Sequence, residues 1–178
     1  MVNLVCSRSN EITREKAEKM IVEKFGYPRA HEIEIDWQNI YFLKKLSQKL
    51  EGRGWIYREQ GKSYTGSITG ITEQGKKQGL SLVEHISGFL PSNTVKGKIC
   101  EERFIEATGI IKKERTLAFV EYTYKYDNPT EFYKIIESVV EDINRPRPST
   151  LENIILSGST ITLPKLNEIR SNQLRFIL

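Results

Sequence analysis

The segment Gly70–Lys77, with the sequence GITEQGKK, carries most of the pattern of a phosphate-binding P-loop. Such a loop wraps backbone amides around the phosphates of a nucleotide, and a Ser or Thr after its lysine holds the magnesium ion. Here Lys77 occupies that position and cannot ligate a cation, while Glu73 places a carboxylate where the phosphates would lie. We therefore predict that the segment binds no nucleotide, and that Thr72 caps a helix whose first turn contains Glu73.

The other residues with catalytic or metal-binding potential form no recognised pattern. His31 and His85 are the only histidines, and neither has a second histidine at the spacing of metal ligands. Glu101 and Glu102 are neighbours in a predicted strand, so their side chains point to opposite faces and form no acid–base pair. Cys100 in the same strand is expected to be a small buried residue. The sequence therefore predicts a protein that is not an enzyme, with no catalytic residue, no metal site and no cofactor.

Three tyrosines, Tyr122, Tyr124 and Tyr126, alternate along a predicted strand and therefore share one face of it. Such a stripe could stack bases or sugars. The same pattern is typical of a half-buried sheet face, and we expect this face to pack on the predicted helix Phe132–Ile143. The two tryptophans are likewise expected in the core.

The composition is that of a globular protein, with 38% hydrophobic and 28% charged residues in a chain of 178. This length suffices for one ordinary domain or two small ones. The net charge is only +4, but eight basic and three acidic residues between positions 44 and 79 give that segment a charge of +5. Such an excess can attract phosphate or anionic lipid, or it can form a solvated face. No run approaches the ~18 apolar residues of a membrane span.

The first residues, MVNLVCS, are mostly apolar up to Cys6 and turn polar at Ser7. They can be interpreted as a short frayed tail, or as the end of a lipoprotein signal in which Cys6 is the lipidated residue. The stretch itself lacks the charged region and the apolar core that a signal needs. Membrane contact is expected only through a lipid anchor at Cys6. The predicted location is the cell envelope if Cys6 is lipidated, and the cytoplasm otherwise.

Apolar spacing and capping residues predict four helices and several strands. The four helices are expected at Thr13–Phe25, Asp36–Leu50, Thr72 to about Ile86, and Asn128–Ile143. Strands are expected around them, with two in the wing region, and a break at Phe89–Asn93 separates two halves. The helices and strands do not alternate as βαβ units, which favours an α+β fold. The strands are expected at 31–35, 55–59, 64–71, 96–107, 117–126, 154–156 and 160–163.

The sequence LSQKLEGRGWIYRE … SITGITEQGKK, within residues 40–82, resembles the recognition helix and wing of winged-helix domains in MarR- and PadR-like bacterial regulators. Those families place three helices before the wing, whereas this chain has two. The resemblance implies that Lys44, Lys45 and Lys49 lie on the helix that faces the DNA groove. It also implies that Arg58 and Lys62 contact the DNA backbone from the wing.

A second stretch, KICEERFIEATGI … LAFVEYTYKYDNPTEF, is similar to uncharacterised bacterial lipoproteins of the cell envelope. This similarity covers the chain only loosely and implies no activity. It implies a location, with Cys6 as the lipidated residue.

Together these observations predict an α+β protein with a winged-helix-like N-terminal half, followed by a small antiparallel sheet packed on one helix. The expected parts are a tail or signal remnant (1–11), a winged-helix-like domain (12–90) and a small α+β domain (94–178). We expect a non-catalytic binding or interaction protein of the bacterial cell envelope, whose protein or envelope partner is unknown. The alternative is a DNA-binding transcriptional regulator whose second half dimerises or senses a ligand, with nucleic acid as the partner. A purely structural module is a third interpretation.

Overall fold

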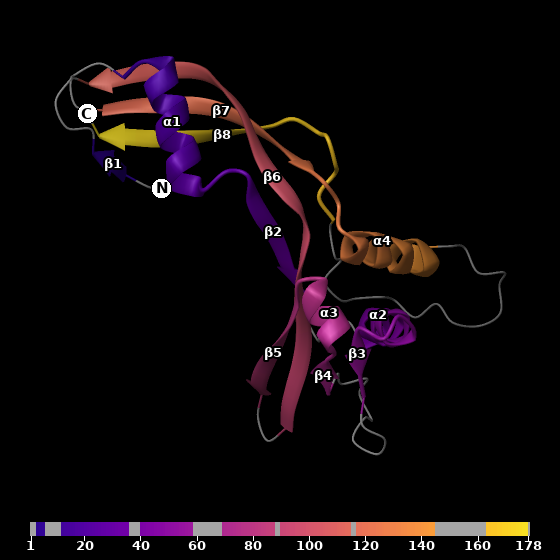
Figure 1. The fold of residues 1–178 in the computed structure, drawn as a ribbon. Coiled ribbons are helices and arrows are strands. Elements are labelled where there is room, and N and C mark those ends of the chain that lie inside the picture. Colours follow the sequence, from indigo (N-terminus) through magenta and orange to yellow (C-terminus); the bar gives the residue numbers. More distant parts are fainter. Residues whose placement is uncertain are drawn as a thin grey trace. The chain divides into compact units, whose positions relative to one another are not determined.

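A computed structural model describes the chain in seven ranges: 3–5, 12–35, 40–58, 69–87, 90–114, 117–144 and 163–177. The chain forms two compact units, each built from segments that are distant in the sequence (Figure 1). Unit 1 comprises Met1–His31, Cys100–Asn128 and Pro164–Leu178, and unit 2 comprises Glu32–Ile99 and Pro129–Leu163.

Unit 1 is a curled sheet with one helix against its inner face. The sheet order is β1-β8-β7-β6-β2, and β5 pairs with β6 outside this path. β6, β7 and β8 are antiparallel, whereas β1 runs parallel to β8 with Asn3 opposite Arg175. β2 and β6 contribute residues to both units. The bounds of these elements are β1 (Asn3–Val5), α1 (Arg14–Phe25), β2 (Arg29–Glu34), β6 (Leu90–Glu114), β7 (Leu117–Asp127) and β8 (Arg170–Ile177).

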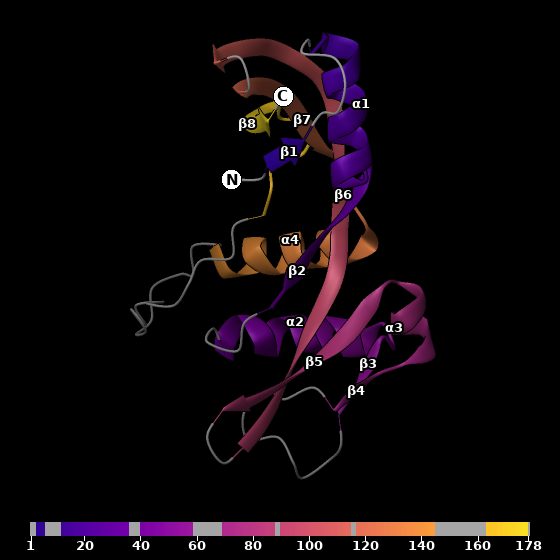
Figure 2. The same ribbon diagram turned by 90° about the vertical axis from the view of Figure 1, so that its left-hand side faces the viewer.

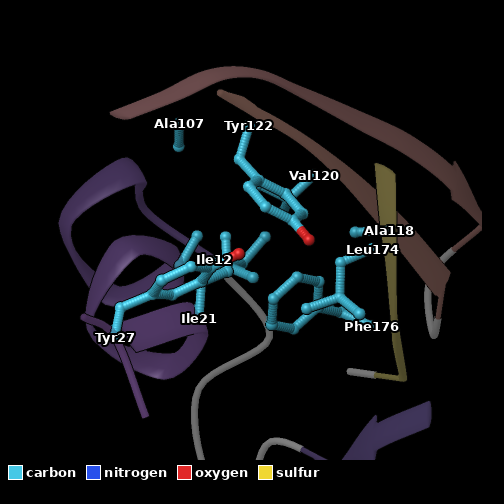
Figure 3. Packing of buried hydrophobic residues seen from close by; sticks show 10 residues of the cluster. Ile12, Ile21, Tyr27, Ala107, Ala118, Val120, Tyr122, Leu174 and Phe176 are labelled. Atoms are coloured by element: carbon cyan, nitrogen blue, oxygen red, sulfur yellow. The ribbon is translucent and has the colours of Figure 1, made fainter. Parts of the chain in front are cut away.

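Helix α1 forms where capping and spacing predict it. The Thr13 side chain accepts a hydrogen bond from the Lys16 backbone N–H, and Gly26 ends the helix at φ +65°, a conformation that glycine adopts without strain. Ala17 and Ile21, four residues apart on one face of the helix, are fully buried. They pack in an apolar cluster under the arching strands (Figure 3), with Ile12, Tyr27, Ala107, Ala118, Val120, Tyr122, Leu174 and Phe176.

Strand β6 bends because its pairing with β7 is interrupted at three points. The register shifts between Phe104 and Glu106, between Ala107 and Gly109, and between Lys112 and Glu114. A bulge adds an unpaired residue, bends its strand and increases the local twist. These irregularities let the sheet curve over α1.

Unit 2 contains a helix pair, a small two-stranded ladder and a hairpin. α2 and α4 contact each other (Figure 2), and both contribute to the buried residues of this unit. β3 and β4 pair antiparallel, and β5 forms an antiparallel hairpin with the start of β6. The bounds are α2 (Ile40–Gly52), β3 (Ile56–Tyr57), β4 (Gly70–Ile71), α3 (Glu73–Lys77), β5 (Leu80–Ser87) and α4 (Glu131–Asn144).

The predicted fold, a winged-helix-like N-terminal half followed by a small antiparallel sheet packed on one helix, is wrong. A curled, mainly antiparallel sheet dominates the core, and its strands come from both ends of the chain. The tyrosine-bearing face of β7 packs on α1, through Ala17 and Ile21, rather than on the helix at 131–144. Periodicity identifies the apolar face of each element, but it does not say which faces meet.

The predicted helix from Thr72 to about Ile86 is also wrong. α3 ends at Lys77, Gly79 has φ +78°, and Leu80–Ser87 is the strand β5. The boundary expected at Phe89–Asn93 is also wrong, because β6 begins at Leu90 and pairs there with Ser87 of β5. The hairpin expected at 154–163 lies outside the described residues, except for Leu163.

Candidate functional site

Glu102 in β6 is a buried acid that binds two polar side chains, Tyr27 and Arg29, inside unit 1. The residue is only 5% exposed. One carboxylate oxygen, Oε1, accepts a hydrogen bond from the Tyr27 hydroxyl at 2.7 Å. Nη2 of Arg29 donates to Oε1 at 2.8 Å and to Oε2 at 2.9 Å. Both oxygens of the buried carboxylate are therefore occupied by donors from the segment just after α1, which offsets the cost of burying the charge.

The protonation states of the two donors fit this arrangement. Burial, and then the hydrogen bond to Glu102, raise the pKa of the Tyr27 hydroxyl well above its usual value, so Tyr27 remains a donor. Burial lowers the pKa of Arg29, but the hydrogen bond to Glu102 and its charge raise it more. The Arg29 guanidinium also lies 5.4 Å from the centre of the Phe25 ring and 5.3 Å from that of Tyr27. A general base needs an oxygen that is available to accept a proton. Both carboxylate oxygens of Glu102 already accept hydrogen bonds, so the geometry does not favour this role for Glu102.

Next to this carboxylate, His31, Arg170 and Tyr124 contact the buried ring of Tyr126, which lies opposite Glu102 in the β6–β7 register. The His31 ring centre lies 4.7 Å from that of Tyr126, and the Arg170 guanidinium lies 5.0 Å from the same ring. Tyr124 contacts Tyr126 edge-to-face at 5.9 Å. The side chains of Arg29 and Arg170 are 43% and 37% exposed, whereas Tyr126 is 8% exposed. We call these five residues, Arg29, His31, Tyr124, Tyr126 and Arg170, the Tyr126 patch.

His31 is held neutral by its surroundings. Burial lowers the pKa of its imidazole, and the positive charges of Arg29 and Arg170 act in the same direction. The Glu102 carboxylate opposes them. Since the usual pKa of histidine is about 6.5, the ring is uncharged at neutral pH. The patch therefore presents one neutral ring with hydrogen-bonding nitrogens and two guanidinium groups, which pair with Glu102 and Glu168 and remain partly exposed.

Sequence reasoning missed the role of Glu102. The available signal was its position, two residues from buried Cys100 and from Phe104, which contributes to the core, because alternate residues of a strand share a face. An acid at an inward position requires a partner. Its partners, Tyr27 and Arg29, lie more than 70 residues earlier. The prediction that Cys100 is buried is confirmed, as it is for Tyr122 and Tyr126.

The residues predicted to contact DNA do not share one free basic face. Lys44 is exposed and Lys45 is half-buried on α2. Nζ of Lys49 donates to Ser138 Oγ at 2.9 Å and to Asp142 Oδ2 at 2.7 Å, both on α4. The remaining predicted contact within the described residues, Arg58, forms an ion pair with Glu51, whereas Lys62 and the lipidation candidate Cys6 lie outside those residues.

The helix start predicted within GITEQGKK is confirmed, although the helix ends at Lys77 rather than near Ile86. Thr72 caps α3, its hydroxyl accepting the Gly75 backbone N–H at 3.1 Å, and Glu73 lies in the first turn. Steric contacts explain why both positions of the motif are glycine. A Cβ at Gly75 would overlap the Trp55 carbonyl, and one at Gly70 would overlap the Tyr57 ring.

Comparison with known proteins returns no relative: no protein-family model, no curated protein and no solved structure matches the chain. Among the residues that the structure describes, no three His, Cys, Asp or Glu side chains gather as a metal site would require. None of the helices in the described ranges is long and apolar enough to cross a membrane.

Proposed function

We propose that this chain is a non-catalytic interaction protein of the bacterial cell envelope that contacts its partner through the Tyr126 patch. The observation that carries the proposal is the closed network of Glu102, Tyr27 and Arg29. Because both carboxylate oxygens of Glu102 already accept hydrogen bonds, we assign this buried charge a structural role. It fixes Arg29, whose side chain is still 43% exposed, at the edge of an aromatic cluster.

The chemistry of the patch favours an acidic protein surface as partner. Arginine guanidinium groups bind carboxylates through paired N–H donors, and arginine and tyrosine are among the residues most enriched in the energetic centres of protein interfaces. Arg170 lies over the Tyr126 ring, and Tyr124 and His31 add half-buried rings beside it. Arg29 bonds to Glu102, which lies opposite Tyr126 in the β6–β7 register. A partner carboxylate at Arg29 or Arg170 would gain charge-assisted hydrogen bonds next to a partly apolar surface.

The envelope location follows from the sequence similarity to lipoproteins and from Cys6. Asn3–Val5 pairs with β8, and processing of a lipoprotein immediately before Cys6 would remove these three residues. The anchored form would therefore lack β1, whereas an unprocessed form keeps it. Metabolic labelling with a palmitate analogue distinguishes the two forms. Incorporation that is lost in Cys6→Ser supports the envelope location, and labelling that is equal in wild type and variant contradicts it.

Site-specific photocrosslinking in cells tests the proposed contact. A benzoylphenylalanine at position 124 replaces one half-buried aromatic ring by another and should yield a discrete adduct with a protein of the envelope fraction. Arg170→Gln should abolish that adduct. Lys165→Gln should leave it, and is a matched control because Lys165 and Arg170 both pair with Glu168. The absence of any adduct, or equal loss in both variants, would contradict the proposal.

The DNA-binding alternative receives less support from the geometry, because Lys49 and Arg58 have acidic partners. We expect fluorescence anisotropy with random duplex DNA to show no binding that weakens steeply between about 50 and about 200 mM salt. Micromolar binding with a steep salt dependence, lost on charge reversal at Lys44 and Lys45, would favour the regulator instead.

A further inference from the structure

The sheet of unit 1 has a second face, opposite α1, that no described element of this unit covers. In β7 the buried residues Ala118, Val120 and Tyr122 point to α1, so Phe119 and Glu121 point to the outer face. The strand register extends this face to the neighbouring strands. Ile111 of β6 and Arg175 of β8 both lie opposite Phe119.

One end of this outer face is apolar. Ile111 is 41% exposed, and Leu117, Phe119 and Ile177 are half-buried, with no helix of the described part of unit 1 above them. Leu117 lies opposite Ile177 in the β7–β8 register, directly beside the row of Ile111, Phe119 and Arg175. Neighbouring cross-strand rows bring these side chains into contact. Together they form a continuous apolar area, which we call the outer patch.

Two charged residues on the same face lack partners. Nε of Arg175 is buried without a hydrogen-bond partner, and its guanidinium forms no ion pair within the described ranges. Glu121 is exposed, and its carboxylate likewise has no hydrogen bond or ion pair among those residues. The two lie on adjacent strands, two register positions apart. Arg175 is only half-buried, so a carboxylate of another molecule can bind the exposed part of its guanidinium and compensate its charge.

We propose that the outer patch is a homodimer interface, in which Arg175 of each copy pairs with Glu121 of the other. In a two-fold symmetric contact the same surface meets itself, so it must be self-complementary. A patch with one unpaired cation and one unpaired anion beside an apolar area meets this condition. Two sheets stacked face to face, about 10 Å apart, interdigitate such side chains. Charge complementarity within the patch is why a second copy, rather than another protein, is the occupant.

Sedimentation equilibrium on the full chain, with a charge exchange, tests this interface. The wild type is expected to dimerise, and Arg175→Glu or Glu121→Arg should each raise the dissociation constant about tenfold or more, because like charges then meet. The double variant E121R/R175E should restore dimerisation to near the wild-type level. Ile111→Asp should abolish it. Lys19→Glu, an equal charge reversal at an exposed position of α1, is the matched control and should have no effect.

Either of two results would overturn the proposal: a wild-type chain that stays monomeric at its highest soluble concentration, or a dimer that both single charge variants leave unchanged. Circular dichroism of each variant checks that unit 1 remains folded. The inference is independent of the proposed partner contact, since Tyr124 belongs to the opposite face of the sheet. Loss of the Tyr124 crosslink would leave the dimer standing, and loss of the dimer would leave the crosslink standing.

Discussion

At the scale of single residues, Glu102 explains why Tyr27 and Arg29 lie where they do. A carboxylate that is 5% exposed is stable only if hydrogen bonds replace its lost hydration. The phenol and the guanidinium supply these bonds, and Arg29 keeps part of its own hydration because its side chain is 43% exposed. The network thus ties the segment after α1 to the inner side of β6.

Removing the carboxylate should therefore cost more than removing one of its donors. We expect Glu102→Ala to lower the free energy of unfolding by about 3 kcal/mol, because it leaves Arg29 and the Tyr27 hydroxyl without their acceptor. Tyr27→Phe should cost about 1 kcal/mol, the worth of one hydrogen bond. Urea unfolding measures both. A Glu102→Ala cost no larger than that of Tyr27→Phe would show that the charge needs no compensation at this site.

His31 should make the protein less stable in mild acid. Its pKa in the folded state is lowered, so the unfolded chain binds more protons, and stability must fall as the pH drops below about 6.5. We expect the difference in unfolding free energy between about pH 7.5 and about pH 5.5 to shrink in His31→Gln. An unchanged pH dependence in His31→Gln would show that another group is responsible.

At the scale of elements, the glycines of GITEQGKK allow neighbouring groups to pack closely against the backbone. A Cβ at Gly75 would overlap the Trp55 carbonyl, so Gly75→Ala should destabilise the chain by about 1–3 kcal/mol. At Gly52, the last residue of α2, a Cβ would project into open space, with no atom within 4 Å. Gly52→Ala is therefore expected to be neutral or to stabilise by up to about 1 kcal/mol. Urea unfolding of the two variants compares the same chemical change, and equal effects would contradict this steric explanation.

Capping residues and the spacing of apolar residues correctly predict the elements whose signals lie within their own sequence. α1, with Thr13 and Gly26 at its ends, and the alternating strand β7 form where they are expected. The segment Leu80–Ser87 does not, because Thr72 signals a helix start while the strand depends on pairing with residues 90–97. Pairing partners of this kind are set by tertiary contacts, which propensity cannot anticipate.

The candidate site was less predictable than the elements. The burial of the tyrosine stripe follows from alternation in β7, and the inward position of Glu102 could have been inferred in the same way. Its partners could not, because Tyr27 and Arg29 lie 75 and 73 residues away in the sequence. For the basic residues of α2, the sequence suggested a contact that the structure does not favour. The resemblance implied that they contact DNA together, whereas Lys49 bonds to Asp142 of α4.

At the scale of the whole molecule, the two units interleave along the chain. Residues 12–31 belong with segments 100–128 and 164–178. A fragment of residues 12–90 should therefore fail to fold as an independent domain, since the apolar face of α1 would lose Val120, Leu174 and Phe176. We expect poorly dispersed amide signals in its NMR spectrum, in contrast to the full chain. A well-dispersed spectrum with protected amides in α1 would contradict this expectation.

The parallel pairing of β1 with β8 joins Asn3 to Arg175, residues from opposite ends of the described chain. During synthesis on the ribosome, α1 is translated before β6 and β7, and Leu174 and Phe176 of β8 are the last members of its apolar cluster to be translated. At rates of about 5–20 residues per second, translation of the roughly 150 residues from the end of α1 to Phe176 takes about 8–30 seconds. The apolar cluster around Ala17 and Ile21 therefore stays incomplete throughout this interval, and unit 1 completes its fold only once β8 has left the ribosome.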